Sequence, residues 1–310
     1  MARPRHKRRD VTGILILDKP AGLTSNAALQ EAKRLFDAAK AGHTGSLDPI
    51  ATGVLPLCFG EATKFSKFLL EADKRYRATI KLGIATASGD ADGEIVSTAE
   101  VPQLERERLE RVLDGFRGVI EQTPSMYSAI KVEGQPLYKL ARKGIEVERK
   151  SRQVTIHRFV LERFTEDELE VDIVCSKGTY VRSMAEDIGH VLGCGAHVSK
   201  LRRMASGPFD AASAHTLEDL KSIKENKGLH AIDELLEPAS SAVQHWPSVE
   251  LTEVTASYLR QGQAVQIPHA PTQGWVRIFS ESATTGSDFL GVGEILEDGR
   301  VAPRRLVATQ

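Results

Sequence analysis

Cysteine is scarce in this sequence, and long apolar runs are missing. Three cysteines occur among 310 residues and none forms a C-x-x-C pair, which argues against a disulfide framework and against a zinc site. No run approaches the roughly 18 apolar residues that a membrane-spanning helix needs. The basic start MARPRHKRRD also lacks the apolar segment of a secretory signal. We therefore expect a cytoplasmic protein without a membrane partner.

Sequence signatures of cofactor chemistry are also missing. The chain contains no G-x-G-x-x-G after a strand, no G-x-x-x-x-G-K-[ST] and no H-E-x-x-H. The segment SGDADGE is similar to part of a calcium-binding loop, but Ala99 occupies the position where a bidentate Glu would be required. We expect neither an organic cofactor nor a metal.

An excess of positive charge is absent as well, because 41 Lys and Arg face 42 Asp and Glu. Binding of a nucleic acid would therefore depend on local basic patches, which solvated surface explains about equally well. The run at the N-terminus is the best candidate for an RNA-binding arm, because like charges in sequence do not pack into a core. The basic clusters are Arg3, Arg5, Lys7, Arg8 and Arg9; Arg142, Lys143, Arg149, Lys150 and Arg152; Lys200, Arg202 and Arg203; and Arg304 and Arg305.

Apolar residues make up 41% of the chain, which is enough for a sizeable core. Short apolar or alternating runs predict strands at 14–17, 54–59, 76–84, 154–159 and 169–175. Helical spacing predicts helices after Ser25 as N-cap, at 61–72, at 104–116 and at 181–192. This mixture is typical of an α+β fold with a mixed, largely antiparallel sheet.

The composition of the sequence changes after Leu236. The segment EPASSAVQHWPSV holds two prolines and three serines and resembles a linker. From Leu251 onward, short apolar segments bounded by Gly, Pro or Asp predict a small β-rich domain. We divide the chain into a basic tail (1–10), a large domain (11–237), a linker (238–250) and a C-terminal domain (251–310).

One acidic residue is surrounded by glycines in AGHTGSLDPIATG. Asp48 precedes Pro49, and an Asp-Pro pair commonly starts a helix as N-cap and first helical residue. However, Gly42, Gly45 and Gly53 lie close to this acid. Glycine permits positive φ and lets another backbone approach closely, so the pattern also indicates a surface against which a ligand presses.

The stretch GHTGSLDPIATGVLP (42–56) resembles the catalytic motif of the bacterial TruB family, the tRNA pseudouridine-55 synthases. LDKPAGLTSN, DKRYRATIKLG, SMYSAIKVEGQPLY, SKGTYVRSMAEDIG and GCGAHVSKLRR resemble further motifs of that family, so the resemblance covers nearly the whole chain. The end, GVGEILEDGRVAPRRLV, resembles the end of a PUA domain, an RNA-binding β-module. The resemblance implies a pseudouridine synthase fold with a PUA-like domain, and isomerisation of uridine 55 in the T-loop of tRNA to pseudouridine.

The resemblance also implies three catalytic residues. Asp48 matches the nucleophile, although the residues leave open whether it adds to C1′ or C6 or assists proton removal at C2′. Tyr76 matches the active-site tyrosine, whose ring would stack on the flipped uracil; alternatively, it is a core residue of an alternating strand. Arg182 matches the arginine that pairs with the acid and keeps it ionised; the alternative is an ordinary helix-surface arginine.

Five further positions match residues that meet the RNA. Tyr180 and Leu201 match the lining of the uracil pocket, with a plain core role as an alternative for Leu201. His43 matches the histidine beside the extruded nucleotide. Lys19 and Lys64 lie in matching motifs and either contact phosphate or support a loop.

The implied partner is tRNA, bound through its T-arm stem-loop, and we expect a monomeric chain that needs no guide RNA. Two other interpretations stay open. The protein is a chaperone that folds tRNA without catalysis, or it is a guide-RNA-dependent relative that works in a complex. The intact motif around Asp48 favours an enzyme, and the compact length of the chain favours independence.

Overall fold

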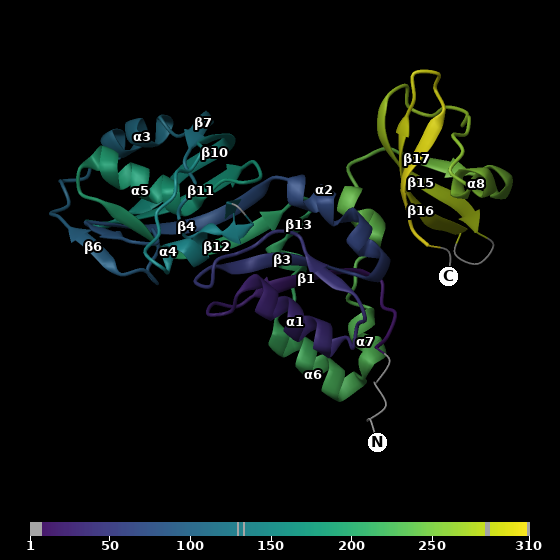
Figure 1. Cartoon of the computed structure of the whole chain (residues 1–310), viewed down its shortest axis with the longest axis horizontal. Helices are drawn as coiled ribbons and strands as arrows, with labels where there is room; N and C mark the ends of the chain where they lie inside the picture. The colour runs from purple at the N-terminus through teal and green to yellow at the C-terminus, as the bar shows by residue number, and fades with distance from the viewer. Residues whose placement is uncertain (1–7, 129, 133, 283–285, 309–310) are drawn as a thin grey trace.

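The computed structural model describes residues 8–128, 130–132, 134–282 and 286–308. It consists of a large α+β domain and a smaller β-rich domain at the C-terminus (Figure 1). The described part of the large domain holds a nine-stranded sheet in the order β1-β3-β12-β4-β11-β10-β7, with β2 beside β3 and β13 beside β12. The strands are β1 (Gly13–Lys19), β2 (Ala41–His43), β3 (Thr52–Phe59), β4 (Lys74–Leu82), β7 (Gly118–Gln122), β10 (Arg152–Phe164), β11 (Glu168–Cys175), β12 (Ala196–Ser206) and β13 (Phe209–Asp210).

Neighbouring strands of this sheet run antiparallel except for β3 and β12, which run parallel. The predicted α+β class with a largely antiparallel sheet is therefore confirmed. The parallel contact is short and pairs Arg202 with Thr52 and Arg203 with Gly53. Two small hairpins lie outside the sheet: β5 (Ile84–Thr86) with β6 (Ile95–Thr98), and β8 (Lys131–Val132) with β9 (Gln135–Pro136).

Helices cover the sheet in two groups (Figure 1). One group packs beside β1, and the other packs near β10 and β12. The first contains α1 (Ser25–Leu35), α6 (Leu217–Lys227) and α7 (Leu229–Asp233), and the second contains α3 (Arg106–Asp114) and α5 (Val181–Leu192). The remaining helical segments are η1 (Gly60–Phe65), α2 (Ser66–Glu71), α4 (Leu137–Ala141), η2 (Ala211–Ser213) and η3 (Ala239–Val243).

The predicted N-cap of the first helix is wrong by one residue. Thr24 keeps an extended backbone and its side chain accepts from the Ala27 amide, so Thr24 is the cap. Ser25 is the first residue of α1, and its hydroxyl instead accepts from the Leu47 amide at 2.7 Å and donates to the Leu47 carbonyl at 3.1 Å. Both residues carry the hydroxyl that a cap requires. Ser25 is buried and fastens the loop that carries Asp48.

The predicted alternating strand ends before Ile84. Strand β4 stops at Leu82 because Gly83 has a φ of +83°, and Ile84 begins the separate hairpin strand β5. A Cβ at Gly83 would lie 2.8 Å from a methyl group of Val101. Within β4, the register places Tyr76 opposite Arg203 of β12 and opposite Ile173 of β11. Tyr76 therefore lies near the middle of the sheet.

The smaller domain has a four-stranded sheet in the order β14-β15-β16-β17, with its own core and one helix. Its elements are β14 (Ser248–Leu251), α8 (Glu253–Arg260), β15 (Gly274–Ser282), β16 (Gly286–Ile295) and β17 (Val301–Leu306). The segment expected to be a linker is packed, because Ala242 and Val243 of η3 are buried in a cluster that also contains Val292. The rings of Phe68, Trp246 and Trp275 extend this contact.

The basic N-terminal tail lies partly outside the described residues, which begin at Arg8. Arg9 belongs to the fold: its guanidinium pairs with Asp233 and its backbone bonds to Asp37 and Ala39. Arg8 is exposed, so it stays a candidate for contact with RNA. In the described part of the chain, no helix is long and apolar enough to cross a bilayer.

Candidate active site

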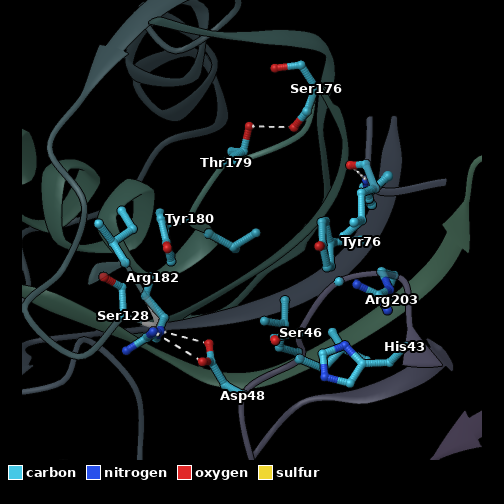
Figure 2. Close-up of a pocket in the computed structure, with 18 residues that line it drawn as sticks. His43, Ser46, Asp48, Tyr76, Ser128, Ser176, Thr179, Tyr180, Arg182 and Arg203 are labelled. Atoms are coloured by element: carbon cyan, nitrogen blue, oxygen red, sulfur yellow. Dashed lines mark hydrogen bonds and ion pairs between the residues drawn. The ribbon is translucent and has the colours of Figure 1, made fainter. Parts of the chain in front are cut away.

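A cavity of about 560 Å³ opens where β4, β12 and the start of α5 meet the loop between β2 and β3 (Figure 2). His43 lines it from the end of β2, and the loop contributes Gly45, Ser46, Leu47 and Asp48. Among its lining residues are six of the eight site residues expected from the sequence: His43, Asp48, Tyr76, Tyr180, Arg182 and Leu201. Side chains that lie far apart in the sequence thus share one concave surface.

Asp48 does not cap a helix. The residues after it form bends, and the Ala51 amide donates to the Asp48 carbonyl at 3.0 Å in a single turn. The N-cap interpretation of the Asp-Pro pair is therefore wrong. Beneath the loop, Lys19 is fully buried, and its ammonium donates to the carbonyls of Pro20 and Leu23 at 2.7 Å and of Pro49 at 3.4 Å. Lys19 supports the loop from below and is not among the residues that line the cavity.

The side chain of Asp48 turns towards Arg182, and the two form an ion pair (Figure 2). Nε of Arg182 lies 2.9 Å from Oδ2, and Nη2 donates to Oδ1 at 3.2 Å. The guanidinium also donates to the carbonyls of Ser88 at 2.7 Å and Tyr127 at 3.0 Å. Only 3% of the Arg182 side chain is exposed, against 34% for Asp48. The arginine is fixed, and the carboxylate keeps one side open to the cavity.

Asp90 provides Arg182 with a second acid partner. Its Oδ2 lies 3.6 Å from Nη1 of Arg182, and the Ser88 hydroxyl and the Asp92 amide both donate to its Oδ1. A cation in the first turn of a helix is disfavoured by the helix dipole, and Arg182 stands at this position in α5. The two carboxylates offset that cost and hold the guanidinium in place.

Two opposing influences set the pKa of Asp48. Burial raises the pKa, and the Arg182 guanidinium acts against this rise. Asp90 adds a further upward contribution, and Lys19 a downward one. The result is a carboxylate with little water around it and one strong cationic partner, which is more basic than an ordinary aspartate. Such a group suits attack on carbon or removal of a proton.

The side chains of Tyr76 and His43 are neutral near pH 7. Burial raises the pKa of the Tyr76 phenol, partly opposed by Arg203. Burial also lowers the pKa of His43, and Arg203 lowers it further. Tyr76 therefore offers a hydroxyl and a flat ring, and His43 offers an uncharged ring that can stack.

Tyr180 and Leu201 complete the walls. The side chain of Gln122 holds the Tyr180 backbone from both sides, donating to its carbonyl at 2.8 Å and accepting from its amide at 2.7 Å. The Arg152 guanidinium lies 4.8 Å from the centre of the Tyr180 ring. Leu201 is 7% exposed and belongs both to the core and to the lining, so its two interpretations coexist.

Lys64 lies outside the cavity. Its ammonium is 2.5 Å from Oε2 of Glu61 and donates to the carbonyl of Leu306 at 2.9 Å. The structure thus places this residue at the contact between the two domains, away from the other seven.

The sequence placed Arg203 in a local basic cluster that either binds a nucleic acid or is solvated surface, and the solvated-surface interpretation is wrong for this residue. Arg203 is 1% exposed and lines the cavity, while its neighbour Arg202 points away and pairs with Asp18 at 2.7 Å. A signal was present, because alternation along a strand places Arg203 on the same face as Leu201. Lys74, Ser128, Ser176 and Thr179 were missed as lining residues. Among the described residues, no group of His, Cys, Asp and Glu is arranged to hold a metal ion.

Comparison with known proteins identifies the relatives of this chain. It is 54% identical to a protein named tRNA pseudouridine synthase B from Nitrosococcus oceani, over 99% of this chain and 98% of that one. It is 52% identical to proteins of the same name from Coxiella burnetii and Pseudomonas aeruginosa, over at least 97% of either chain. This chain belongs to the TruB family. Models of the family match along it: the TruB family pseudouridylate synthase N-terminal domain at 33–181, the tRNA pseudouridylate synthase B C-terminal domain at 182–244, and the pseudouridine synthase II TruB C-terminal model at 247–307.

Two solved structures have the same fold as this TruB-family chain. A chain from the crystal structure of a Cbf5-Nop10-Gar1 complex superposes with a TM-score of 0.72 at 25% identity, covering 96% of this chain and 84% of that one. A chain from a structure of an H/ACA RNP bound to a substrate RNA containing 2′-deoxyuridine gives the same TM-score at 22% identity.

Proposed function

We propose that this TruB-family protein isomerises uridine 55 in the T-loop of tRNA to pseudouridine, with Asp48 as nucleophile. The observation that carries the proposal is the Asp48–Arg182 pair, in which a buried guanidinium orients a carboxylate that stays open to a cavity. Relatives that match along the whole chain are named tRNA pseudouridine synthase B. Their name supports tRNA as the substrate.

The reaction needs only groups that the cavity offers. The N1–C1′ bond breaks and its electron pair stays with the uracil. The base then turns, C5 bonds to C1′, C5 loses its proton and N1 gains one, so the product has the same composition as uridine. The Asp48 carboxylate either bonds to C1′, bonds to C6 or takes a proton from C2′, and all three routes stay open. An isomerisation consumes no electrons and transfers no phosphate, so the chemistry calls for no organic cofactor or metal.

The cavity has the size and the walls for one extruded nucleotide. Ligand pockets typically measure about 300–1,000 Å³, and this one measures about 560 Å³. A base inside a folded loop must be flipped out before chemistry can reach it. In our proposal Tyr76 stacks on the uracil, Tyr180 and Leu201 enclose it, and the neutral ring of His43 meets the RNA that the base has left.

The proposed partner is the T-arm stem-loop of tRNA, bound by a single cytoplasmic chain without a guide RNA. Named relatives that match end to end support independence, whereas the Cbf5 structures are complexes with further components. The PUA-like domain adds affinity for RNA in this proposal, since the residues lining the cavity all lie before it.

The decisive experiment incubates the purified protein with an unmodified tRNA transcript and then maps pseudouridine. We expect modification at position 55 alone, both in the full tRNA and in an isolated T-arm stem-loop. Asp48→Asn should give none. Modification that appears only after a guide RNA is added would contradict the proposal. Faster tRNA folding without any pseudouridine would instead favour the chaperone interpretation.

A further inference from the structure

Arg203 is a buried cation without an acid partner in the described part of the chain. Its side chain is fully enclosed, Nε donates to the Val54 carbonyl at 2.6 Å, and Nη2 has no hydrogen-bond partner. Arg182, the other buried arginine of the cavity, has both Asp48 and Asp90. A buried charge is costly unless an opposite charge meets it. The contrast between the two arginines indicates that Arg203 binds an anion from outside the chain.

The surroundings of Arg203 add positive charge. Lys74 also lines the cavity, and its ammonium donates to the carbonyls of Leu69 and Leu70. Burial lowers the pKa of Lys74 to about 8, and Arg203 lowers it further. Lys19 experiences the same two influences, against an upward one from Asp48, and also has a pKa of about 8. This side of the cavity is therefore electropositive, and its hydrogen-bond acceptors among the described residues are neutral, namely backbone carbonyls and the Tyr76 side chain.

The position of Arg203 is suited to the substrate backbone. Figure 2 shows Arg203 beside Tyr76 and His43, whereas Asp48 and Arg182 lie on the other side of Ser46. Gly45 leaves the approach free of a side chain, since a Cβ there would lie 3.9 Å from Nη1 of Arg203. A nucleotide whose sugar meets Asp48 has two permanent charges close by, one on the phosphate at its 5′ side and one on the phosphate at its 3′ side.

We propose that Arg203 binds a backbone phosphate of the RNA directly attached to the extruded nucleotide. This inference rests on the proposed function, because it takes an RNA substrate for granted. A phosphate oxygen accepts from Nη groups and also neutralises the guanidinium. A uracil carbonyl would satisfy the hydrogen bond but would leave the charge uncompensated. Arg203 therefore anchors the substrate by its backbone while Asp48 acts on the sugar or base.

The test combines a protein variant with a neutral phosphate. T-arm stem-loops carry a methylphosphonate linkage on the 5′ side or on the 3′ side of the target uridine. All proteins carry Asp48→Asn so that the RNA stays unchanged during binding. With Arg203 intact, one of the two linkages should weaken binding about tenfold or more, as expected when a charge-assisted hydrogen bond is lost. The Arg203→Gln protein should bind native RNA as weakly as the Arg203 protein binds RNA with that methylphosphonate. Adding the methylphosphonate to the RNA should weaken binding to Arg203→Gln little further, because both changes remove the same contact.

The salt dependence of binding gives a second readout. Arg203→Gln should lower the slope of log affinity against log salt by about one unit. Arg202→Gln is the matched control, since it removes the same charge one residue away, outside the cavity. It should leave the response to the methylphosphonates unchanged.

Three outcomes would overturn the inference. In the first, neither methylphosphonate weakens the Arg203 protein. In the second, Arg203→Gln keeps full affinity and slope but, with Asp48 restored, reacts slowly at saturation, which would assign Arg203 to the base. In the third, inorganic phosphate binds in an Arg203-dependent way while both methylphosphonates are harmless, which would assign the site to a free anion. If Arg203→Gln does not fold, binding of the two methylphosphonate RNAs to the protein with Arg203 intact still tests the inference. Failure of the proposed function looks different, because the native stem-loop would then not bind.

Discussion

At the scale of single residues, the site contains two buried arginines, of which one has acid partners and the other has none among the described residues. Arg182 meets Asp48 and Asp90, and this pairing leaves the Asp48 carboxylate oriented, poorly solvated and still accessible. Arg203 has no acid partner among the described residues and bonds only to neutral groups, the Val54 carbonyl and the Tyr76 side chain, so its charge stays available. In our proposal one arginine prepares Asp48 for reaction and the other receives the substrate. Lys19 serves neither purpose directly and holds the loop in place.

Asp48→Asn should abolish turnover while preserving binding. The amide keeps the size of the side chain but removes the anionic oxygen, so we expect a loss of at least about three orders of magnitude, or about 4 kcal/mol of barrier. RNA affinity should stay within several-fold of wild type, because no positive charge is lost. The protein should fold, since Asp48 caps no helix. Single-turnover rates at saturating enzyme, with binding measured in parallel, check this. Substantial remaining activity would contradict the assignment of the nucleophile.

Lys19→Met should destabilise the protein by about 2 to 4 kcal/mol, because the carbonyls of Pro20 and Leu23 before α1 and of Pro49 in the Asp48 loop lose their buried donor. The variant should also change the pH dependence of stability. The pKa of Lys19 is about 8 in the fold and 10.5 ordinarily. Between these values the unfolded chain holds a proton that the folded chain has released, so the free energy of unfolding of wild type rises with pH.

Urea unfolding of both proteins from pH 7 to pH 10.5 measures this effect of Lys19. The stability difference between wild type and Lys19→Met should widen as pH rises through the window. Lys74 is present in both proteins, so its own contribution cancels. Parallel stability profiles would show that Lys19 keeps its ordinary pKa.

At the scale of elements, the site depends on the parallel contact between β3 and β12. This contact sets Arg203 beside Gly53 and brings the Asp48 loop, which ends at β3, next to the side chains of β12. Strand β4 pairs with the other edge of β12 and presents Tyr76. Helix α5 then adds Arg182 from its first turn. Four elements thus converge on one cavity, and each contributes one or two of its functional groups.

Gly53→Ala should disrupt this convergence. A Cβ at Gly53 would lie 2.2 Å from the Arg203 carbonyl oxygen, and the φ of +102° disfavours any side chain. We expect a loss of at least about 3 kcal/mol of stability and a fall in rate, since β3 and β12 must separate. Thermal unfolding measures the first effect and single-turnover kinetics the second. Gly22→Ala is the control, because its φ is also positive but a Cβ there meets nothing within 4 Å. Equal stability of the two variants would show that the close approach of β3 to β12 at Gly53 does not determine stability.

At the scale of the whole molecule, the two domains are joined by packed contacts. The 3₁₀ segment η3 buries Ala242 and Val243 against the large domain, and Lys64 reaches the Leu306 carbonyl on β17. Aromatic rings on both sides, Phe65 and Phe289, lie 5.3 Å apart. The cavity lies wholly within the large domain, so in our proposal the small domain adds affinity for RNA and takes no part in the chemistry.

A chain that ends at Pro247 should bind RNA more weakly but keep its rate at saturation. This end point retains η3 and Trp246, whereas a cut after Glu237 would remove η3 and expose the cluster that it covers. Binding titrations and single-turnover rates separate affinity from chemistry. Circular dichroism confirms that the fragment is folded. A folded fragment with a much lower saturated rate would show that the small domain takes part in forming the site.

The sequence by itself determined the class of fold, and its resemblance to a family implied six of the residues that line the cavity. Alternation and helical spacing are local properties of the chain, so they predict strands and helices without knowledge of their neighbours. The tertiary structure alone decided which charges are compensated. Arg203 and Arg202 are adjacent and chemically identical, yet one lines the cavity and the other pairs with Asp18 on the far side of the strand. The resemblance implied that Asp48 pairs with Arg182, but the residues themselves left the helix cap open, and the tertiary structure decided between the two because an ion pair between residues 134 positions apart exists only once the sheet has formed.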